Sequence, residues 1–193
     1  MKAYTSNNIR NIAVLGHGGK GKTTLCEAML YIAGASDRLG RVADGNTVLD
    51  FDSEEKRRKS SVSSAIAALE WDNTKLNIID APGLFDFEGG AAEAVRAAEA
   101  VLIVTSAGSG VDVGTEKAFR AAEKKGAAKF FAVTKTDSDH RNFYKTFDAL
   151  KEVYGNKLCP TIIPYMEGNI TKCYVNLMTG MAFSYDENGK ATK

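Results

Sequence analysis

The sequence predicts an α/β fold with a mostly parallel six-stranded sheet, one antiparallel strand and helices on both faces, followed by a small β appendage at the C-terminus. Short apolar runs alternate with helical patterns along residues 1–155, which is typical of a parallel sheet covered on both faces. Two of these runs lie only three residues apart, which is typical of an antiparallel hairpin. After Gly155, prolines and turn signals replace the helical period and indicate small antiparallel strands.

The individual elements follow from these patterns in chain order. Strands are expected at residues 9–16, 61–71, 75–80, 100–107, 129–135 and near 161–165. Helices are expected at residues 22–34, 87–100, 114–126 and 140–155. Residues 36–60 show no clear period, and so long a polar connection in a compact domain is typical of a functional or a disordered loop.

Composition and charge limit the classes of function. The 193 residues are 44% hydrophobic and 25% charged, with a net charge of +1, so no basic field argues for binding to DNA. No apolar run is long enough to span a bilayer, so no membrane partner is expected. Three cysteines (Cys26, Cys159 and Cys173) show no metal-ligand spacing, which favours reduced thiols in a cytoplasmic protein.

The strongest motif is GHGGKGKTT, which fits the phosphate-binding pattern G-x-x-x-x-G-K-[ST] between an expected strand and an expected helix. Glycines let successive backbone N–H groups surround phosphate oxygens, and the positive end of the following helix points at the same anion. Lys22 is expected to reach the outer phosphates, and the Thr23 hydroxyl to bind Mg²⁺. The motif predicts the P-loop NTPase fold, with the nucleotide-binding residues Gly16, His17, Gly18, Gly19, Lys20, Gly21, Lys22, Thr23 and Thr24.

A second motif, IIDAPG, ends the expected strand at residues 75–80. The strand would deliver Asp80 as an outer-sphere carboxylate for Mg²⁺. Gly83 would then offer a backbone N–H where a γ-phosphate would sit. The pattern D-x-x-G is common by chance, and it gains meaning here because it follows a phosphate-binding loop.

A third motif, VTKTD, ends the expected strand at residues 129–135. The carboxylate of Asp137 can accept hydrogen bonds from N1–H and the 2-amino group of guanine, and adenine offers no such pair of donors. Lys135 can lay its aliphatic stem along the base. With Thr134, these residues predict the guanine-binding end of a nucleotide site.

In order and spacing, four segments resemble the GTP-binding domain of translational elongation factor G. They are IRNIAVLGHGGKGKTTLCEAML, SEEKRRKSSVSSA, LNIIDAPGLFDF and FAVTKTD, and in detail they look closer to the divergent elongation-factor-G-like paralogues. The likeness is strong over residues 9–155 and loose over 156–193. The resemblance implies a ribosome-associated, Mg²⁺-dependent GTPase whose GTP or GDP state switches its grip on the ribosome.

The resemblance also implies a domain organisation. Residues 1–165 would form the P-loop GTP-binding domain, and residues 166–193 would begin the small β subdomain that the family inserts. The Ser-Ala guanine loop, with which the family's domain ends, is not found after Tyr165. The chain is therefore expected to be an N-terminal fragment of a longer protein with further domains.

Several departures from the family bear on the site. By alignment Ser61 stands where the family has a Mg²⁺-binding threonine, which implies Thr23, Ser61 and Asp80 as metal ligands and Lys22, Ser61 and Gly83 as catalytic groups. Lys20 stands where the family has a small residue, and its charge could partly replace that of a monovalent cation. Thr134 replaces an asparagine, which weakens an expected structural hydrogen bond.

The departure with the largest chemical consequence is Leu84. The family usually has a histidine directly after the glycine of D-x-x-G, and that side chain positions the attacking water. Leucine cannot hydrogen-bond water, and orienting groups are worth large rate factors in phosphoryl transfer. We therefore expect GTPase activity with a very low intrinsic rate.

Two alternatives remain beside a GTP-hydrolysing translation factor. The first is a binding module that holds GTP as a signal and hydrolyses little of it, as Leu84 allows. The second is a P-loop ATPase of the deviant Walker type, whose K-G-G-x-G-K-T-T loop resembles HGGKGKTT, although that class requires a lysine where His17 stands. The stage of translation served, the oligomeric state and the remaining domains do not follow from the sequence.

Overall fold

The structure of the chain is a computed structural model that describes residues 2–136, 142–168, 170–185 and 191–192. The chain divides into two compact units. The first comprises Met1–Ser106 and Asp112–Thr134, and the second comprises Ala107–Val111 and Lys135–Lys193. Each unit is described by itself.

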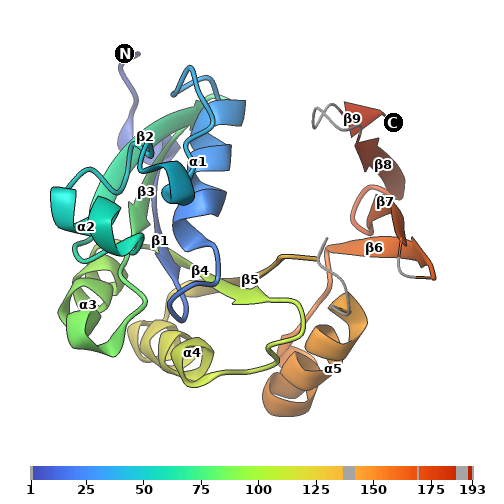
Figure 1. Cartoon of the computed structure of the whole chain (residues 1–193). Coiled ribbons are helices and arrows are strands. Elements are labelled where there is room, and N and C mark those ends of the chain that lie inside the picture. The colour runs from blue at the N-terminus through green and yellow to red at the C-terminus, as the bar shows by residue number, and fades with distance from the viewer. Residues whose placement is uncertain (1, 137–141, 169, 186–190, 193) are drawn as a thin grey trace. The chain divides into compact units, whose positions relative to one another are not determined.

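The first unit contains a five-stranded sheet in the order β2-β3-β1-β4-β5 (Figure 1). Helices and short 3₁₀ turns connect the strands. In chain order the elements are η1 (Ser6–Asn8), β1 (Ile9–Leu15), α1 (Lys22–Ile32), η2 (Val42–Asp44), α2 (Ser53–Arg58), β2 (Ala65–Trp71), β3 (Thr74–Asp80), η3 (Phe85–Phe87), α3 (Glu88–Ala97), β4 (Ala100–Ser106), α4 (Val113–Lys125) and β5 (Ala128–Thr134).

Strand pairing confirms the predicted mixture of parallel and antiparallel neighbours. β1 pairs in parallel with β3 and β4, and β4 pairs in parallel with β5, whereas β2 and β3 are antiparallel. Trp71 lies opposite Thr74, so the hairpin turns on Asp72 and Asn73 alone. Both residues have positive φ, 44° and 56°, as a two-residue turn of type I′ requires. The parallel strands β1, β3, β4 and β5 consequently end at the same edge of the sheet.

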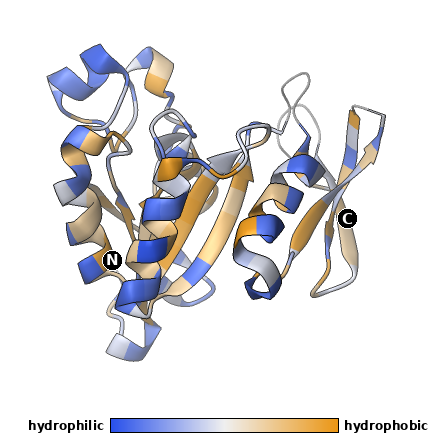
Figure 2. Cartoon of the chain, turned by 90° about the horizontal axis from the view of Figure 1, so that it is seen from below, coloured by the Kyte–Doolittle hydropathy of each residue, from blue (hydrophilic) through white to orange (hydrophobic). Residues whose placement is uncertain are grey.

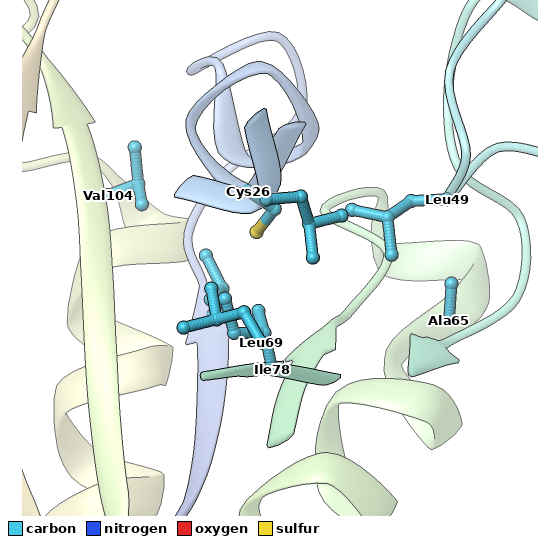
Figure 3. Close-up of a cluster of buried hydrophobic side chains, with 8 residues drawn as sticks. Cys26, Leu49, Ala65, Leu69, Ile78 and Val104 are labelled. Atoms are coloured by element: carbon cyan, nitrogen blue, oxygen red, sulfur yellow. The ribbon is translucent and has the colours of Figure 1, made fainter. Parts of the chain in front are cut away.

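Helices cover both faces of this sheet, as predicted. On one face α1 contributes Cys26 and Leu30 to a buried cluster with Val14, Ile78 and Val104 of the strands, several of which are labelled in Figure 3. On the other face α3 and α4 contact each other and strands β1 and β4. Figure 2 shows these strands as hydrophobic ribbons between helices whose outward sides are hydrophilic. Such a double-sided core explains why the strands are continuous apolar runs.

The segment before β2 contains a helix that the sequence analysis did not predict. α2 begins after Asp52, whose side chain accepts the N–H of Glu54 at 2.7 Å, and Asp52 and Glu55 together form a capping box. Glu55 is buried and also accepts the N–H groups of Val62 and Ser63 at 2.9 and 3.1 Å. Residues 36–60 were expected to form a functional or a disordered loop, and these caps give part of that segment a short helix.

The described part of the second unit contains helix α5, a 3₁₀ turn and a small antiparallel sheet in the order β6-β7-β8-β9. Its elements are α5 (Phe143–Tyr154), η4 (Gly155–Lys157), β6 (Ile162–Glu167), β7 (Ile170–Asn176), β8 (Met181–Tyr185) and β9 (Ala191–Thr192). None of the helices in the described part of the chain is both long and apolar enough to cross a membrane.

The number of strands expected in the main sheet was wrong by one. The segment near residues 161–165 forms β6, which pairs with β7 in the second sheet and not with the main sheet. β7 follows β6 almost at once, and pairing with so near a neighbour closes a shorter loop than pairing with a distant strand. β6 is an edge strand, where Pro164 is tolerated although it has no N–H. The domain boundary expected at residue 165 falls inside β6, and the assignment of an inserted subdomain stays a prediction.

The double-sided core predicts a contrast between two isoleucines. Ile78 of β3 is completely buried, whereas Ile66 of β2 is 71% exposed. Ile78→Ala should lower the free energy of unfolding by about 3 kcal/mol, because it removes buried methyl groups and leaves a cavity. Ile66→Ala, the matched control, should lower it by about 0.5 kcal/mol. Urea denaturation of the two variants measures the difference, and similar midpoints would contradict the placement of β3 in the core.

Candidate nucleotide-binding site

The predicted residues of the phosphate and metal sites gather at the edge of the main sheet where its parallel strands end. β1 leads into the glycine-rich loop, which continues into α1 at Lys22. Gly16 has a φ of 137°, and a Cβ on it would strike the backbone carbonyl of Val104 in β4. Gly21 is the N-cap of α1 with a φ of 88°, again in the left-handed region. Glycine is thus required at both ends of the loop, and the loop presents the N-terminus of α1.

Lys22 and Gly83 meet beneath the loop. The Lys22 side chain is buried, and its ammonium donates to the carbonyl oxygen of His17 at 3.1 Å. A Cβ on Gly83 would collide with the Lys22 ammonium and come within 2.7 Å of the Gly18 nitrogen. The glycine of D-x-x-G therefore lies against the phosphate loop, and only a residue without a side chain fits there.

Three segments meet at the hydroxyl group of Thr23 at the start of α1. This hydroxyl donates to Oδ2 of Asp80 at 2.6 Å, and it lies 3.1 Å from the hydroxyl of Ser61. Ser61 in turn donates to Oδ1 of Asp50 at 2.7 Å. All four side chains are buried. The structure thus brings together Thr23, Ser61 and Asp80, the predicted metal ligands, and adds Asp50.

Burial shifts the ionisation of the charged members of this cluster. It raises the pKa of Asp80 to about 7, although the hydrogen bond from Thr23 and the charge of Lys22 oppose the rise. It also raises the pKa of Asp50 and lowers that of Lys22, the latter against the attraction of Asp80. Two carboxylates with one ammonium leave the site short of positive charge when both are ionised.

The donor set suits a hard divalent cation such as Mg²⁺. The Oδ1 atom of Asp80 and the Oδ2 atom of Asp50 are buried without a hydrogen-bond partner among the described residues. When Thr23 and Ser61 donate to their carboxylates, their oxygens turn lone pairs toward each other. Hydroxyl and carboxylate oxygens are the ligands that Mg²⁺ prefers. No cluster of three or more His, Cys, Asp or Glu side chains suited to a metal occurs in the described part of the chain.

The outer side of the loop is fixed by Lys20. Its ammonium lies 3.1 Å from Oδ2 of Asp112, and its carbonyl accepts the Thr134 hydroxyl at 2.6 Å. Burial opposes ionisation of Asp112, but hydrogen bonds from Thr115 and the Lys20 ammonium outweigh it and hold the pKa below its usual range. The charge of Lys20 is thus engaged by a carboxylate of the protein. Thr134 joins the end of β5 to the loop although it replaces an amide side chain.

Leu84 lies over the loop at Gly18. A Cβ on Gly18 would come within 3.0 Å of Cδ2 of Leu84, so the leucine occupies the side of the loop that Gly18 leaves open. The next residue, Phe85, meets the His17 ring edge-on at 5.6 Å between ring centroids and lies under the Lys117 ammonium at 4.5 Å. His17 therefore packs against an aromatic ring, which favours a structural role for its imidazole.

Leu84 and Phe85 also line an apolar pocket of about 430 Å³ between α3 and α4. The pocket touches the phosphate loop at Gly16 and the D-x-x-G motif at Gly83. Its remaining walls are mainly alanine and other apolar residues, which do not suit a triphosphate. The pocket is thus a neighbour of the phosphate site and is chemically distinct from it.

Not all predicted nucleotide-binding residues are buried, and one of them lies outside the described residues. Gly19 in the loop and Thr24 on the first turn of α1 are both exposed, unlike the buried cluster around Thr23. Lys135 belongs to the second unit, is exposed and has a φ of 56°. Asp137 lies outside the described residues, so the guanine-reading role of Lys135 and Asp137 stays a prediction.

Two residues of the site were missed by the sequence analysis. Asp50 lies in a segment without periodicity, and no local signal marks it. Asp112 accepts the N–H of Thr115 at 2.8 Å and caps α4, and a capping pattern before a helix was the available signal. The capping pattern does not reveal that the carboxylate of Asp112 also pairs with Lys20 of the phosphate loop.

Comparison with known proteins now identifies the family. The model of the elongation factor Tu GTP binding domain matches residues 7–189. The chain belongs to this family. An elongation factor G-like protein of Mycobacterium tuberculosis (strain ATCC 25618 / H37Rv) is 34% identical over 96% of the chain and 25% of its own length. Elongation factor G of Granulibacter bethesdensis is 32% identical over 85% of the chain and 24% of its own length. The predicted resemblance is confirmed, and the chain spans about a quarter of these relatives.

Solved structures share this fold. A crystal structure of a protein from Thermus thermophilus superposes with a TM-score of 0.89 at 36% identity, covering 96% of the chain and 28% of that protein. The bacterial selenocysteine-specific elongation factor EF-Sec superposes with a TM-score of 0.62 at 25% identity, covering 77% and 24%. The predicted fold class is confirmed, and the chain is an elongation factor G-like GTP-binding domain.

The hydrogen bond from Thr134 to the Lys20 carbonyl predicts that removing the Thr134 hydroxyl lowers the affinity for GTP. A change in folding stability alone would not lower this affinity. Thr134→Val should weaken GTP binding about fivefold, since the Lys20 carbonyl loses a hydrogen bond worth about 1 kcal/mol. Thr74→Val makes the same exchange beside the hairpin at the far end of β3 and should leave the affinity unchanged. Calorimetric titration with GTP compares the two variants. Equal affinities would show that Thr134 does not hold the loop.

Proposed function

We propose that the chain is the Mg²⁺-dependent, GTP-binding and GTP-hydrolysing switch domain of a ribosome-associated elongation factor. The observation that carries the proposal is the meeting of Thr23, Ser61 and Asp80 beside Lys22. These residues come from the phosphate loop, the segment before β2 and the end of β3. A site in which three separate segments converge on one point can sense the nucleotide and pass its state to two movable segments.

The chain's own residues would share the work of binding. The backbone of residues 16–21 and the N-terminus of α1 receive the phosphates, and Lys22 exchanges the His17 carbonyl for phosphate oxygens. Gly83 brings its N–H to the outer end of the loop. Bound Mg²⁺ would supply charge neutralisation at the phosphate oxygens, held by the hydroxyls of Thr23 and Ser61 with Asp80 behind them.

Guanine specificity rests on the family and on the third motif. The matching family model is one of GTP-binding domains, which disfavours the deviant Walker ATPase. Asp137 follows β5 by three residues and supplies the carboxylate that guanine requires. Lys135 provides an aliphatic stem beside the base. GTP and GDP are accordingly the proposed ligands.

The partner and the surroundings are proposed from the relatives. Their names include elongation factor G and, in Debaryomyces hansenii, mitochondrial ribosome-releasing factor 2. A ribosome partner, a cytoplasmic location and dependence on the ribosome for rapid turnover follow by analogy. The chain spans about a quarter of most of these relatives, so these properties are proposed for a longer protein that would contain it.

A second candidate function is favoured by Leu84. This residue has no group that orients water, and its side chain lies against the phosphate loop at Gly18. An apolar side chain at this point can exclude water from the outer phosphate. The domain would then hold GTP as an occupancy signal and hydrolyse it poorly.

The phosphate-loop assignment is tested by Lys22→Ala. The variant should lose tight GTP binding, because it removes the buried ammonium aimed at the β- and γ-phosphates. Lys124→Ala, an exposed lysine on α4, is the control and should bind normally. Calorimetry measures both, and competition by ATP tests base specificity. Unchanged affinity in Lys22→Ala would reject the phosphate site, and effective competition by ATP would reject the guanine site.

Hydrolysis is tested by Leu84→His. In the isolated domain we expect little change, because the proposed activator is absent. In the full-length protein with ribosomes, kcat should rise about tenfold or more, which is ~1.4 kcal/mol of barrier. Leu84→Met is the apolar control and should show no gain. A parent protein that already turns over as fast as ordinary elongation factor G would show that another group positions the water.

A further inference from the structure

Glu27 is a buried carboxylate that binding at the phosphate loop does not use. It lies on α1 four residues after Thr23, hence on the same face of the helix, and is fully buried. Its Oε1 atom accepts the backbone N–H groups of Val48 and Leu49 at 2.8 and 3.0 Å. One oxygen of α1 therefore holds two consecutive N–H groups of the segment that leads to α2.

The held backbone leads directly to the site. Asp50 follows Leu49 and accepts the Ser61 hydroxyl, which lies 3.1 Å from the hydroxyl of Thr23. A continuous series of contacts thus starts on α1 at Glu27, passes through residues 48–50 and Ser61, and returns to α1 at Thr23. Helix α1 fixes both ends of this series. A displacement of residues 48–50 would move Asp50 and Ser61 together.

The chain also passes closely over Glu27 at a second point. A Cβ on Gly40 would collide with Oε2 of Glu27 and come within 2.9 Å of the Thr47 Cα. Gly40 is thus the residue that lets the backbone cross the carboxylate. Leu49 is buried in the same cluster as Cys26 and Leu30 of α1, so the segment is seated on the helix by apolar contacts as well.

Stability alone does not account for a carboxylate at this position. Oε2 of Glu27 is buried without a hydrogen-bond partner among the described residues, and such a group destabilises the fold. Its charge adds to that of Asp50 and raises the pKa of Asp80 further, beyond the effect of burial. Neutral glutamine could accept the same two N–H groups. The two hydrogen bonds accepted by Oε1 therefore explain why a side chain of this length lies here. We call these two hydrogen bonds the tether, and the tether, rather than the charge of Glu27, is the feature to test.

We propose that Glu27 is a positioning residue that seats residues 47–50 on α1, so that Asp50 and Ser61 meet Thr23 at the outer phosphate of bound GTP. The inference rests on the proposed function. Glu27 does not touch the nucleotide and acts through Asp50 and Ser61. The proposed contacts to a diphosphate, from the backbone of residues 16–21 and from Lys22, do not include these two residues. Loss of the tether should therefore weaken the binding of GTP with Mg²⁺ and spare the binding of GDP without Mg²⁺.

Three variants of the whole chain test this proposal with a non-hydrolysable GTP analogue in Mg²⁺ and with GDP in EDTA. Glu27→Ala should bind the analogue about tenfold more weakly, since two hydrogen bonds are lost, while GDP affinity changes less than about twofold. Glu27→Gln should restore analogue binding, because its amide oxygen accepts both N–H groups. Glu99→Ala is the matched control, because Glu99 accepts the backbone N–H of Asn11 at the far end of the sheet.

The outcomes separate the inference from the function on which it rests. Equal losses for the analogue and GDP, no loss beyond that of Glu99→Ala, or no rescue by Glu27→Gln would each overturn the positioning role. Failure of the unmodified chain to bind GTP would reject the proposed function instead. If Glu27→Ala does not fold, Glu27→Asp replaces it. The shorter side chain keeps the charge and cannot reach both N–H groups, so the analogue alone should bind more weakly.

Discussion

The hydroxyl of Thr23 is a single small group, yet the arrangement of the site depends on where it lies. It joins the start of α1 to the end of β3 at Asp80 and to the segment before β2 at Ser61. Burying Asp80 there is unfavourable, as the rise of its pKa to about 7 shows. A nearby cation offsets this cost when Asp80 is ionised, and Lys22 supplies part of that charge. The remainder is what a nucleotide-bound Mg²⁺ would bring.

The topology explains how these groups can meet at all. Parallel strands present their carboxyl ends at the same edge of the sheet, and β1 and β3 are immediate neighbours there. The loop after β1 therefore lies beside Asp80 without a long connection. α1 then becomes the scaffold of the site, because it carries Lys22 and Thr23 at its start and Glu27 one turn later. The strands that end at this edge are buried on both faces, whereas Asp50 and Ser61 reach it from a segment outside the sheet.

Much of the fold and of the site could be predicted from the sequence, because the signals lie in short stretches of adjacent residues. The phosphate loop, Asp80 and Gly83 all sit in short motifs at strand ends, where a few adjacent residues determine the chemistry. The hairpin of β2 and β3 could be predicted because only a turn separates the two strands. Helix α2 was missed although its capping box is local, and the other failures depend on partners distant in sequence. Asp50 and the Lys20–Asp112 pair have no local pattern, and β6 reads as a strand whichever sheet it joins.

We propose that the cluster around Thr23 binds the Mg²⁺ that accompanies GTP, and the affinity for a GTP analogue with and without Mg²⁺ tests this directly. A non-hydrolysable GTP analogue should be titrated into the unmodified chain by calorimetry, once with Mg²⁺ and once with EDTA. Oxygen ligands from Thr23 and Ser61, with Asp80 unpaired at one oxygen, predict binding at least about tenfold tighter with the metal. Equal affinity in EDTA would show that the converging hydroxyls and carboxylates do not hold a cation, and the account would be wrong at its centre.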